Sequence, residues 1–184
     1  MRVIAGTLKG RTLRVPADAT FRPTTDRVKE SVFNILHGLV EWSSTTVCDL
    51  FAGSGSLGIE ALSRGASSAV FVESHRASLA VLTRNLAELA VTTQARVVQR
   101  AVESFLRERA ARYSLVFADP PYRFENMESL IENIAGIMAP EGLAVLEHAR
   151  AREVSAPSSL RIVDRRDYGT TAVTFFQPTP GAQT

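Results

Sequence analysis

"TVCDLFAGSGSLGIEALSRG", residues 46–65, places an apolar strand, a glycine-rich turn and a helical pattern in immediate succession. The glycines of the turn, Gly53, Gly55 and Gly58, have the spacing G-x-G-x-x-G that cofactor-binding loops use between a strand and a helix. Glycine lets the backbone turn sharply and approach a ligand, and a helix N-terminus offers free N–H groups. The stretch therefore predicts a strand, loop and helix that bind a cofactor, with a tight turn that binds nothing as the alternative.

The alternation of strand and helix continues to residue 148. Short apolar runs predict strands at 46–51, 68–73, 95–99, 113–119 and 142–148, and the spacing between them predicts helices at 56–65, 76–90, 102–110 and 126–138. Apolar strands separated by helices are typical of a parallel sheet covered on both faces. Residues 159–178 then contain two strands around "DYGT", which predict an antiparallel hairpin.

The predicted fold is an α/β, mainly parallel seven-stranded sheet with a C-terminal antiparallel hairpin. A dinucleotide-binding Rossmann domain would add a sixth parallel strand, whereas class I (Rossmann-like) S-adenosylmethionine-dependent methyltransferases end in such a reversed pair. Before the sheet, strands at 2–6 and 11–15 predict a β-hairpin, and residues 20–39 predict a helix capped at Thr25 or Asp26. The predicted parts are a basic RNA-contacting extension at 1–20, a methyltransferase domain at 21–177 and a flexible tail at 178–184.

Composition indicates one domain with an ordinary core. Of the 184 residues, 45% are hydrophobic and 22% are charged. The single Cys48 cannot form an internal disulfide, no stretch is apolar enough to span a membrane, and the N-terminus has no signal-peptide pattern. We therefore expect a cytoplasmic monomer without a metal site.

Basic residues are concentrated near the N-terminus. Residues 1–40 hold seven Lys and Arg against three Asp and Glu, whereas residues 41–184 hold fourteen against sixteen. Clustered basic residues gain affinity for nucleic acid by releasing counterions, so this segment is expected to bind RNA, although a solvated basic surface is equally consistent with the charge. The polar cluster of Arg22, Thr24, Asp26 and Arg27 would line the active site or grip phosphate, or else only cap a helix.

Acidic residues at the strand ends narrow the choice of cofactor. Asp49 would repel a pyrophosphate but could hold an ammonium group, which favours S-adenosylmethionine over a dinucleotide. Glu73 ends the second strand and suits the ribose hydroxyls of an adenosine. After the third strand, many methyltransferases carry an acid that contacts the adenine. This chain has Arg100 and Ala101 there, and Glu103 is the nearest carboxylate, so we expect the adenine to be contacted by the backbone. The predicted cofactor residues are Asp49, Gly53, Ser54, Gly55, Gly58, Glu73, Ser74 and Ala101.

The fourth strand ends in "VFADPPYRFE", residues 116–125. If it lies beside the first strand, this end is at the switch point where open α/β sheets bind ligands. Two prolines stiffen the turn, so that the Asp119 carboxylate and the Pro120 carbonyl can accept hydrogen bonds from an exocyclic amine and aim its lone pair at a methyl group. Tyr122 and Phe124 can stack on the base, and Asp119 can take the released proton. The predicted catalytic residues are Asp119, Pro120, Pro121 and Tyr122, with a plain turn as the alternative.

Four motifs together resemble the RsmD family over about residues 1–177: "RVIAGTLKGRTLRVP", "RPTTDRVKESVFNIL", "DLFAGSGSLGIEALSRGA" and "FADPPY". The resemblance implies methylation of N2 of guanine 966 in 16S ribosomal RNA, with S-adenosylmethionine as cofactor, in the small ribosomal subunit or its assembly intermediate. It also implies that the cofactor site includes Asp49, Gly53, Gly55 and Glu73, that residues 119–122 form the catalytic loop and that the N-terminal hairpin contacts RNA. The predicted RNA-contacting residues are Arg2, Lys9, Arg11, Arg14, Arg22, Thr24, Arg27 and Phe124.

Other functions would use part of the same motifs. A DNA adenine or cytosine amino methyltransferase would use residues 119–122, but it needs a target-recognition region for which this chain has little room. A nicotinamide-dependent oxidoreductase would use the glycine loop and Glu73 and leave residues 119–122 without a role, and an RNA-binding chaperone would not need Asp119. His37 and His148 are expected to be structural. The residues alone do not distinguish guanine from adenine, because both bases carry an exocyclic amine.

Overall fold

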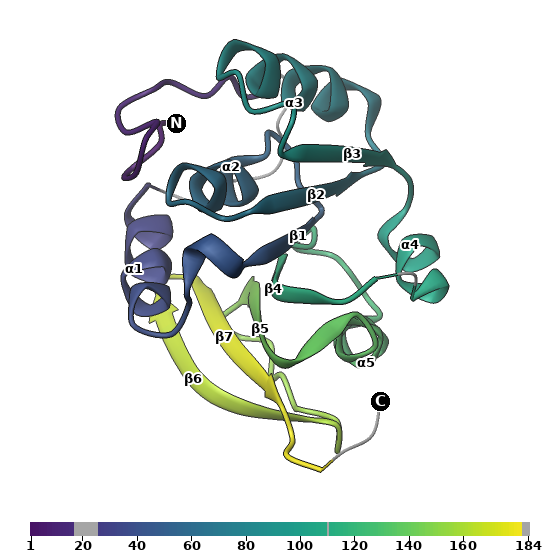
Figure 1. The fold of residues 1–184 in the computed structure, drawn as a ribbon. Coiled ribbons are helices and arrows are strands. Elements are labelled where there is room, and N and C mark those ends of the chain that lie inside the picture. The colour runs from purple at the N-terminus through teal and green to yellow at the C-terminus, as the bar shows by residue number, and fades with distance from the viewer. Residues whose placement is uncertain (17–25, 110, 182–184) are drawn as a thin grey trace.

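The protein is described by a computed structural model that covers residues 1–16, 26–109 and 111–181. Its centre is a seven-stranded sheet with the strand order β3-β2-β1-β4-β5-β7-β6 (Figure 1). The strands are β1 Thr46–Leu50, β2 Ser68–Glu73, β3 Ala95–Gln99, β4 Tyr113–Ala118, β5 Met138–Ala149, β6 Leu160–Tyr168 and β7 Thr171–Pro178. β7 runs antiparallel to both of its neighbours, and the remaining pairs are parallel. The predicted fold class is thus confirmed, with the switch point between β1 and β4.

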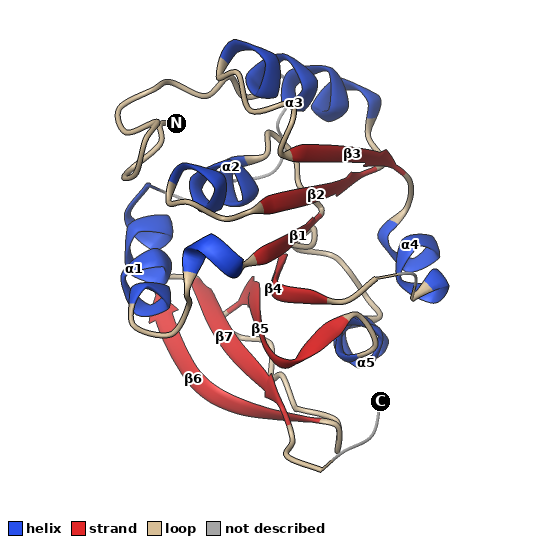
Figure 2. Cartoon of the chain, viewed as in Figure 1, coloured by secondary structure: helices blue, strands red, loops and turns tan. Residues whose placement is uncertain are grey.

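Helices cover both faces of this sheet (Figure 2). They are α1 Asp26–His37, a 3-10 turn at Trp42–Ser44, α2 Ser56–Ser63, α3 Arg76–Glu88, α4 Val102–Glu108 and α5 Met127–Ala135. Successive residues of a strand point to opposite faces, so Val47 of β1 packs with α1, α2 and α3, whereas Cys48 packs with α4 and α5. Burial on both faces explains why the central strands are continuously apolar.

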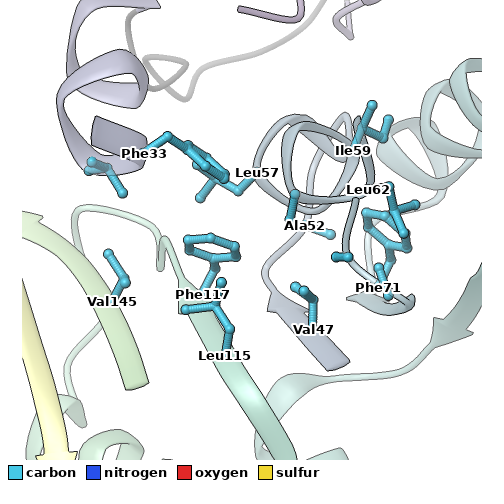
Figure 3. Packing of buried hydrophobic residues seen from close by; sticks show 14 of the residues in the cluster. Phe33, Val47, Ala52, Leu57, Ile59, Leu62, Phe71, Leu115, Phe117 and Val145 are labelled. Carbon is cyan, nitrogen blue, oxygen red and sulfur yellow. The ribbon is translucent and has the colours of Figure 1, made fainter. Parts of the chain in front are cut away.

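Aromatic packing fixes α1 against the strand that carries the predicted catalytic loop (Figure 3). The ring of Phe33 in α1 lies 5.5 Å from the ring of Phe117 in β4 and 5.8 Å from the ring of Trp42, measured between centroids. Phe33 and Phe117 are fully buried, and burial of such a side chain contributes about 1.5–3 kcal/mol. The helix that follows the N-terminal segment therefore has a defined position beside the end of β4.

The N-terminal segment differs from the predicted pair of strands. The chain turns back on itself, with the Val3 N–H donating to the Arg11 carbonyl at 2.9 Å. Within the described residues, however, the pairing is reduced to one antiparallel bridge between Arg2 and Thr12. The predicted hairpin is therefore present as an antiparallel reversal of the chain, but the strands predicted at 2–6 and 11–15 are shortened to that single bridge.

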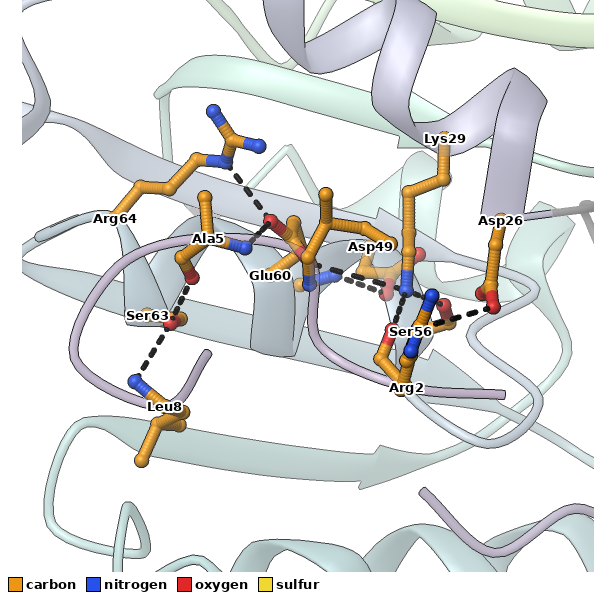
Figure 4. A network of polar contacts seen from close by, with 12 residues as sticks. Arg2, Ala5, Leu8, Asp26, Lys29, Asp49, Ser56, Glu60, Ser63 and Arg64 are labelled. Atoms are coloured by element: carbon orange, nitrogen blue, oxygen red, sulfur yellow. Dashed lines mark hydrogen bonds and ion pairs between the residues drawn. The ribbon is translucent and has the colours of Figure 1, made fainter. Parts of the chain in front are cut away.

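Side chains of α2 explain this difference (Figure 4). The Ile4 and Ala5 N–H groups donate to the carboxylate of Glu60, at 2.7 and 3.0 Å, and the Leu8 N–H donates to the Ser63 hydroxyl at 3.0 Å. A backbone N–H that donates to a side chain of α2 is not available for pairing within the segment, so the hydrogen bonds between residues 1–3 and 10–13 do not extend to Ile4 and Ala5. The segment is consequently packed against α2.

The remaining boundaries shift by a few residues. The helix predicted at 126–138 ends at Ala135, and β5 begins at Met138, four residues before the predicted strand at 142–148. The helix predicted from Thr25 or Asp26 begins at Asp26 and ends at His37, and Thr25 lies outside the described residues. In the described ranges, no helix combines the length and the apolar character that a membrane crossing requires. The proposed division at residue 20 stays a prediction.

Candidate active site

A cavity of about 1550 Å³ opens at the carboxyl ends of β1, β2, β4 and β5. The predicted cofactor and catalytic residues that line it are Asp49, Gly53, Ser54, Glu73, Ser74, Ala101, Asp119, Pro120, Pro121 and Tyr122. Segments that are about seventy residues apart in the chain therefore meet in one space. The position agrees with the rule that open α/β sheets bind ligands beyond the carboxyl ends of their strands, at a switch point.

The glycine loop holds the backbone in conformations that suit close approach. Gly53 and Gly55 have φ values of 55° and 83°, in the left-handed region that favours glycine. A Cβ on Gly58 would lie 2.3 Å from Cε1 of Phe71, so the absence of a side chain there lets α2 pack tightly on β2. Phe51, just before the loop, has a φ of 59°, and a non-glycine residue held there is strained. Gly55 and Gly58 thus allow close packing on the side of the loop away from the cavity, whereas Gly53 faces the cavity.

Asp49 is a buried acid that lines the cavity beside the glycine loop. It is 2% exposed, and its Oδ2 accepts a hydrogen bond from the Gly58 N–H at 2.9 Å. Burial raises the pKa of this carboxyl from 3.8 to about 7; the hydrogen bond from Gly58 opposes the rise, and the charge of Glu73 adds to it. A ligand cation beside Asp49 would stabilise its ionised form, which fits the predicted contact with an ammonium group.

Glu73 organises the loops at the ends of β1 and β2. Its Oε2 accepts from the Gly53 N–H at 2.8 Å, and its Oε1 accepts from the N–H groups of Ser74 and His75 at 2.7 Å each. A carboxylate has about four acceptor positions, so capacity remains for a hydroxyl. The predicted contact with a ribose stays a prediction, and Glu73 has a second role in positioning Gly53.

The loop after β4 forms the other half of the cavity. The Tyr122 side chain is 56% exposed, and its hydroxyl donates to the Thr170 carbonyl at 3.2 Å, which joins the loop to the tip of the β6–β7 hairpin. Phe124 packs edge to face against Phe51 with 5.4 Å between ring centroids, and its carbonyl accepts a hydrogen bond from Arg152. Tyr122 thus presents an accessible ring, whereas Phe124 braces the loop against the end of β1.

The predicted RNA-contacting residues fall into different environments. Arg27 and Phe124 line the cavity, whereas Arg2, Lys9, Arg11 and Arg14 do not, and Arg22 and Thr24 lie outside the described residues. Arg14 pairs with the Glu88 carboxylate of α3 at 3.0 Å, and Arg11 donates to the Glu88 carbonyl at 2.9 Å. Hydrogen bonds from Arg14 and Arg84 lower the pKa of the Glu88 carboxyl from 4.5 to about 2. Arg2 also lies 4.0 Å from the Asp26 carboxylate, so three of the predicted RNA-contacting arginines already have a partner within the chain.

A buried polar network was not anticipated from the sequence (Figure 4). Lys29 of α1 is 0% exposed and donates to the Arg2 carbonyl at 2.7 Å and to the Ser56 hydroxyl at 3.1 Å, and its Nζ lies 3.8 Å from Oε2 of Glu60. Glu60 also accepts from Arg64 at 2.9 Å. Burial lowers the pKa of Lys29, and the charge of Glu60 opposes that change. The network joins the N-terminal segment, α1 and the first residue of α2, next to the cofactor loop.

Three further residues of the cavity were also missed. Arg123 lines it from the loop after β4, Glu147 from β5, and Arg152 from the segment after β5. Arg123 directly follows Tyr122 and is exposed, so its position beside the motif was the available signal. Glu147 and Arg152 enter the cavity only because β5 and β7 pair with each other beside β4. No local pattern marks them.

Comparison with known proteins gives consistent matches. The model of the family described as Conserved hypothetical protein 95 matches residues 1–177. Ribosomal RNA small subunit methyltransferase D of Escherichia coli strain K12 is 42% identical over 149 residues, which is 80% of this chain and 74% of that protein. The YlbH protein of Bacillus subtilis is 37% identical over 183 residues, 96% of this chain and 98% of that protein. Among solved structures, the yhhF protein of Escherichia coli superposes with a TM-score of 0.85 at 36% identity, over 97% of each chain.

Proposed function

This chain belongs to the family described as Conserved hypothetical protein 95, the RsmD family that its motifs resemble, and from that membership we propose that it transfers a methyl group from S-adenosylmethionine to the exocyclic N2 of a guanine in 16S ribosomal RNA. One observation carries the proposal. The glycine loop with its buried acid and the Asp119–Tyr122 turn open into the same cavity. A methyl donor and an amine acceptor must meet in one space for the transfer to occur.

The cofactor half of the cavity fits S-adenosylmethionine. The cofactor supplies an electrophilic methyl group carried on a sulfonium, together with an ammonium group and an adenosine. Asp49 offers a buried carboxylate whose charge a cation would stabilise, and Glu73 retains acceptor capacity for a hydroxyl. A pyrophosphate beside Asp49 would instead add a second negative charge to a buried site, which disfavours a dinucleotide.

The base half of the cavity fits an aromatic amine. The amine nitrogen is a poor nucleophile because its lone pair is delocalised into the ring. Hydrogen bonds from its two N–H groups to the Asp119 carboxylate and the Pro120 carbonyl would hold the nitrogen in place and favour the geometry in which the lone pair is available. Tyr122 would stack on the ring, which is worth on the order of 1–3 kcal/mol. As the nitrogen gains the methyl group it loses one proton, which Asp119 is placed to accept.

The surroundings of the cavity fit an RNA substrate. Arg27 and Arg123 are exposed side chains at the edge of the cavity and could pair with phosphates on either side of the target nucleotide. The partner we propose is 16S ribosomal RNA within the small ribosomal subunit or its assembly intermediate, bound by a monomer in the cytoplasm. In this arrangement the target base would leave its stack to enter the cavity, as in other enzymes that modify bases.

The proposal is tested by incubating the protein and radiolabelled S-adenosylmethionine with small subunits from a strain that lacks the homologous enzyme. Label should appear in 16S RNA, and mass mapping of nuclease fragments should place it on N2 of one guanine. Subunits from the parent strain, already methylated, are the control and should take up little label. Label on an adenine or cytosine, or no label in naked RNA, assembly intermediates or mature subunits, would overturn the proposal.

A further inference from the structure

Glu147 lies beside the catalytic loop, on the next strand of the sheet. In the parallel pairing of β4 and β5, Ala118 is opposite Leu146, so Asp119 and Glu147 are the next positions along the two strands. Neighbouring strands are about 4.8 Å apart, and both residues are half-buried and line the cavity. Asp119 and Glu147 therefore line the same part of the cavity from neighbouring strands.

The strand pattern places both side chains on one face. Phe117 and Val145, two residues earlier on each strand, belong to the core cluster that packs against α1 and α2. Side chains two positions apart in a strand point to the same face, so Glu147 points to the α1 side of the sheet, and Asp119 follows the same alternation just beyond the end of β4. Across the sheet, Glu147 pairs with Val173 of β7, which belongs to the same cluster.

Several contacts hold the end of β5 in place relative to the catalytic loop. The Tyr122 hydroxyl bonds to the Thr170 carbonyl, and Thr171 pairs with Ala149, two residues beyond Glu147. On the opposite face, Nε2 of His148 lies 2.9 Å from the Thr174 hydroxyl. A group that reads a substrate must be held in position, and these contacts supply that support.

Two adjacent acceptors discriminate between bases. On guanine, the N2 amine is flanked by N1–H, so the edge presents donors side by side. On adenine and cytosine, the exocyclic amine is flanked by a ring nitrogen that is itself an acceptor. A carboxylate beside the amine site would accept the N1–H of guanine but would face a lone pair on adenine or cytosine, and an unmatched buried polar group is costly.

Resting on the proposed function, we propose that Glu147 is the specificity-determining residue for the target base. Its carboxylate accepts the N1–H of guanine while Asp119 and Pro120 hold the N2 amine. Asp119 thus selects an amine, and Glu147 selects the base that carries it. This assignment gives a physical reason why guanine is selected. The Asp119–Tyr122 motif alone gives none, since it suits any exocyclic amine.

The test compares guanine with 2-aminopurine at the mapped target position of a reconstituted subunit. 2-Aminopurine keeps the amine at C2 but has an acceptor at N1. The unaltered protein should favour guanine by about 10- to 100-fold in kcat/KM, because the Glu147 carboxylate would face the N1 lone pair of 2-aminopurine in place of the N1–H donor of guanine. Glu147→Gln should abolish or reverse this preference because its amide can donate to N1, and Glu147→Ala should also reduce it. Glu141→Gln, an exposed carboxylate at the other end of β5, is the matched control and should leave the ratio unchanged.

The outcomes separate the two proposals. Calorimetry should show that Glu147→Gln binds S-adenosylmethionine as the unaltered protein does, so that a change in the ratio reports on the base. If the unaltered protein methylates guanine, and both Glu147→Gln and Glu147→Ala keep its preference for guanine over 2-aminopurine, the role of Glu147 is wrong and the proposed function stands. If the unaltered protein labels no ribosomal RNA, the proposed function fails, and the role of Glu147 fails with it.

Discussion

At the scale of single residues, burial and charge decide what the two halves of the cavity can hold. Burial raises the pKa of the Asp49 carboxyl to about 7, whereas Asp119 is a half-buried acceptor at the end of β4. The first is suited to respond to a positive ligand, because a nearby cation favours the ionised form. The second is suited to accept hydrogen bonds from an amine. We therefore expect substitutions of the two acids to have different effects, on cofactor binding for Asp49 and on turnover for Asp119.

Asp49 should make cofactor binding depend on pH. Its pKa of about 7 is above the ordinary 3.8, so the folded protein holds the proton more tightly and this group's contribution to stability falls as pH rises from about 4 to about 7. Binding of an ammonium group needs the ionised form, so affinity for S-adenosylmethionine should weaken by up to tenfold per unit of pH below about 7. Calorimetry from pH 5.5 to 8.5 measures this slope. Asp49→Asn should bind weakly with a flat profile; an unchanged slope would contradict the role of Asp49.

Asp119 should matter for turnover and not for cofactor binding. Asp119→Ala removes one acceptor for the amine and the group that takes the proton, so the single-turnover rate should fall by about 10²- to 10⁴-fold. The dissociation constant for S-adenosylmethionine should change little, because Asp49 and the glycine loop remain. A variant with nearly normal turnover would rule out the proposed role of Asp119.

At the scale of elements, α2 connects the cofactor loop with the N-terminal segment. Its first residue, Ser56, directly follows the glycine loop, and Glu60 and Ser63 bind the backbone of residues 4–8. Lys29 of α1 completes this connection through Ser56 and the Arg2 carbonyl. The helix is buried along its whole length, so a change in its polar partners should be transmitted to the loop.

Removal of the Glu60 charge should destabilise the fold strongly. Glu60→Gln leaves the buried Lys29 ammonium without its anionic partner, and breaking a buried pair in this way costs about 3–5 kcal/mol. Denaturant unfolding measures the loss, and the double variant with Lys29→Met should be less destabilised than the sum of the two single changes. Glu88→Gln, which removes two exposed ion pairs, with Arg14 and Arg84, is the control and should shift stability much less. Equal effects of Glu60→Gln and Glu88→Gln would contradict the importance of burial.

At the scale of the whole molecule, two groups of basic residues are candidates for the surface that binds RNA. One lies at the edge of the cavity and the other on the N-terminal segment. Arg27 and Arg123 are exposed at the cavity, whereas Arg11 and Arg14 are engaged with Glu88 of α3. RNA phosphates would have to displace Glu88 to bind Arg14. Truncation of residues 1–15 is a poor test, because Val3 and Leu13 belong to the core.

Single arginine variants should separate the two surfaces. Arg27→Ala and Arg123→Ala should each weaken binding of small-subunit RNA and reduce the slope of log K against log salt by about 0.7–0.9, the value for one phosphate contact. Arg14→Ala should change the slope less, since its guanidinium already has a partner. Fluorescence anisotropy at several salt concentrations measures the slopes. A larger effect of Arg14→Ala than of Arg27→Ala would favour the N-terminal segment as the main RNA surface.

The sequence by itself determined the succession of strands and helices along the chain, the glycine loop and the turn at residues 119–122. These features are local: apolar periodicity, the G-x-G-x-x-G spacing and the two prolines after Asp119 each depend on residues close together in the chain. The reversed final strand was also predictable, because "DYGT" joins two β-prone runs at hairpin distance.

Only the tertiary structure decided the features that depend on distant partners. Strands at 2–6 and 11–15 were predicted from local β propensity, but Glu60, more than fifty residues away, accepts the backbone N–H groups of Ile4 and Ala5, and the pairing is reduced to one bridge. Glu147 joins the Asp119 side of the cavity through the register of β4 and β5. Contacts between residues so far apart leave no periodic signal, because they are set by how helices and strands pack and not by the conformation of either segment alone.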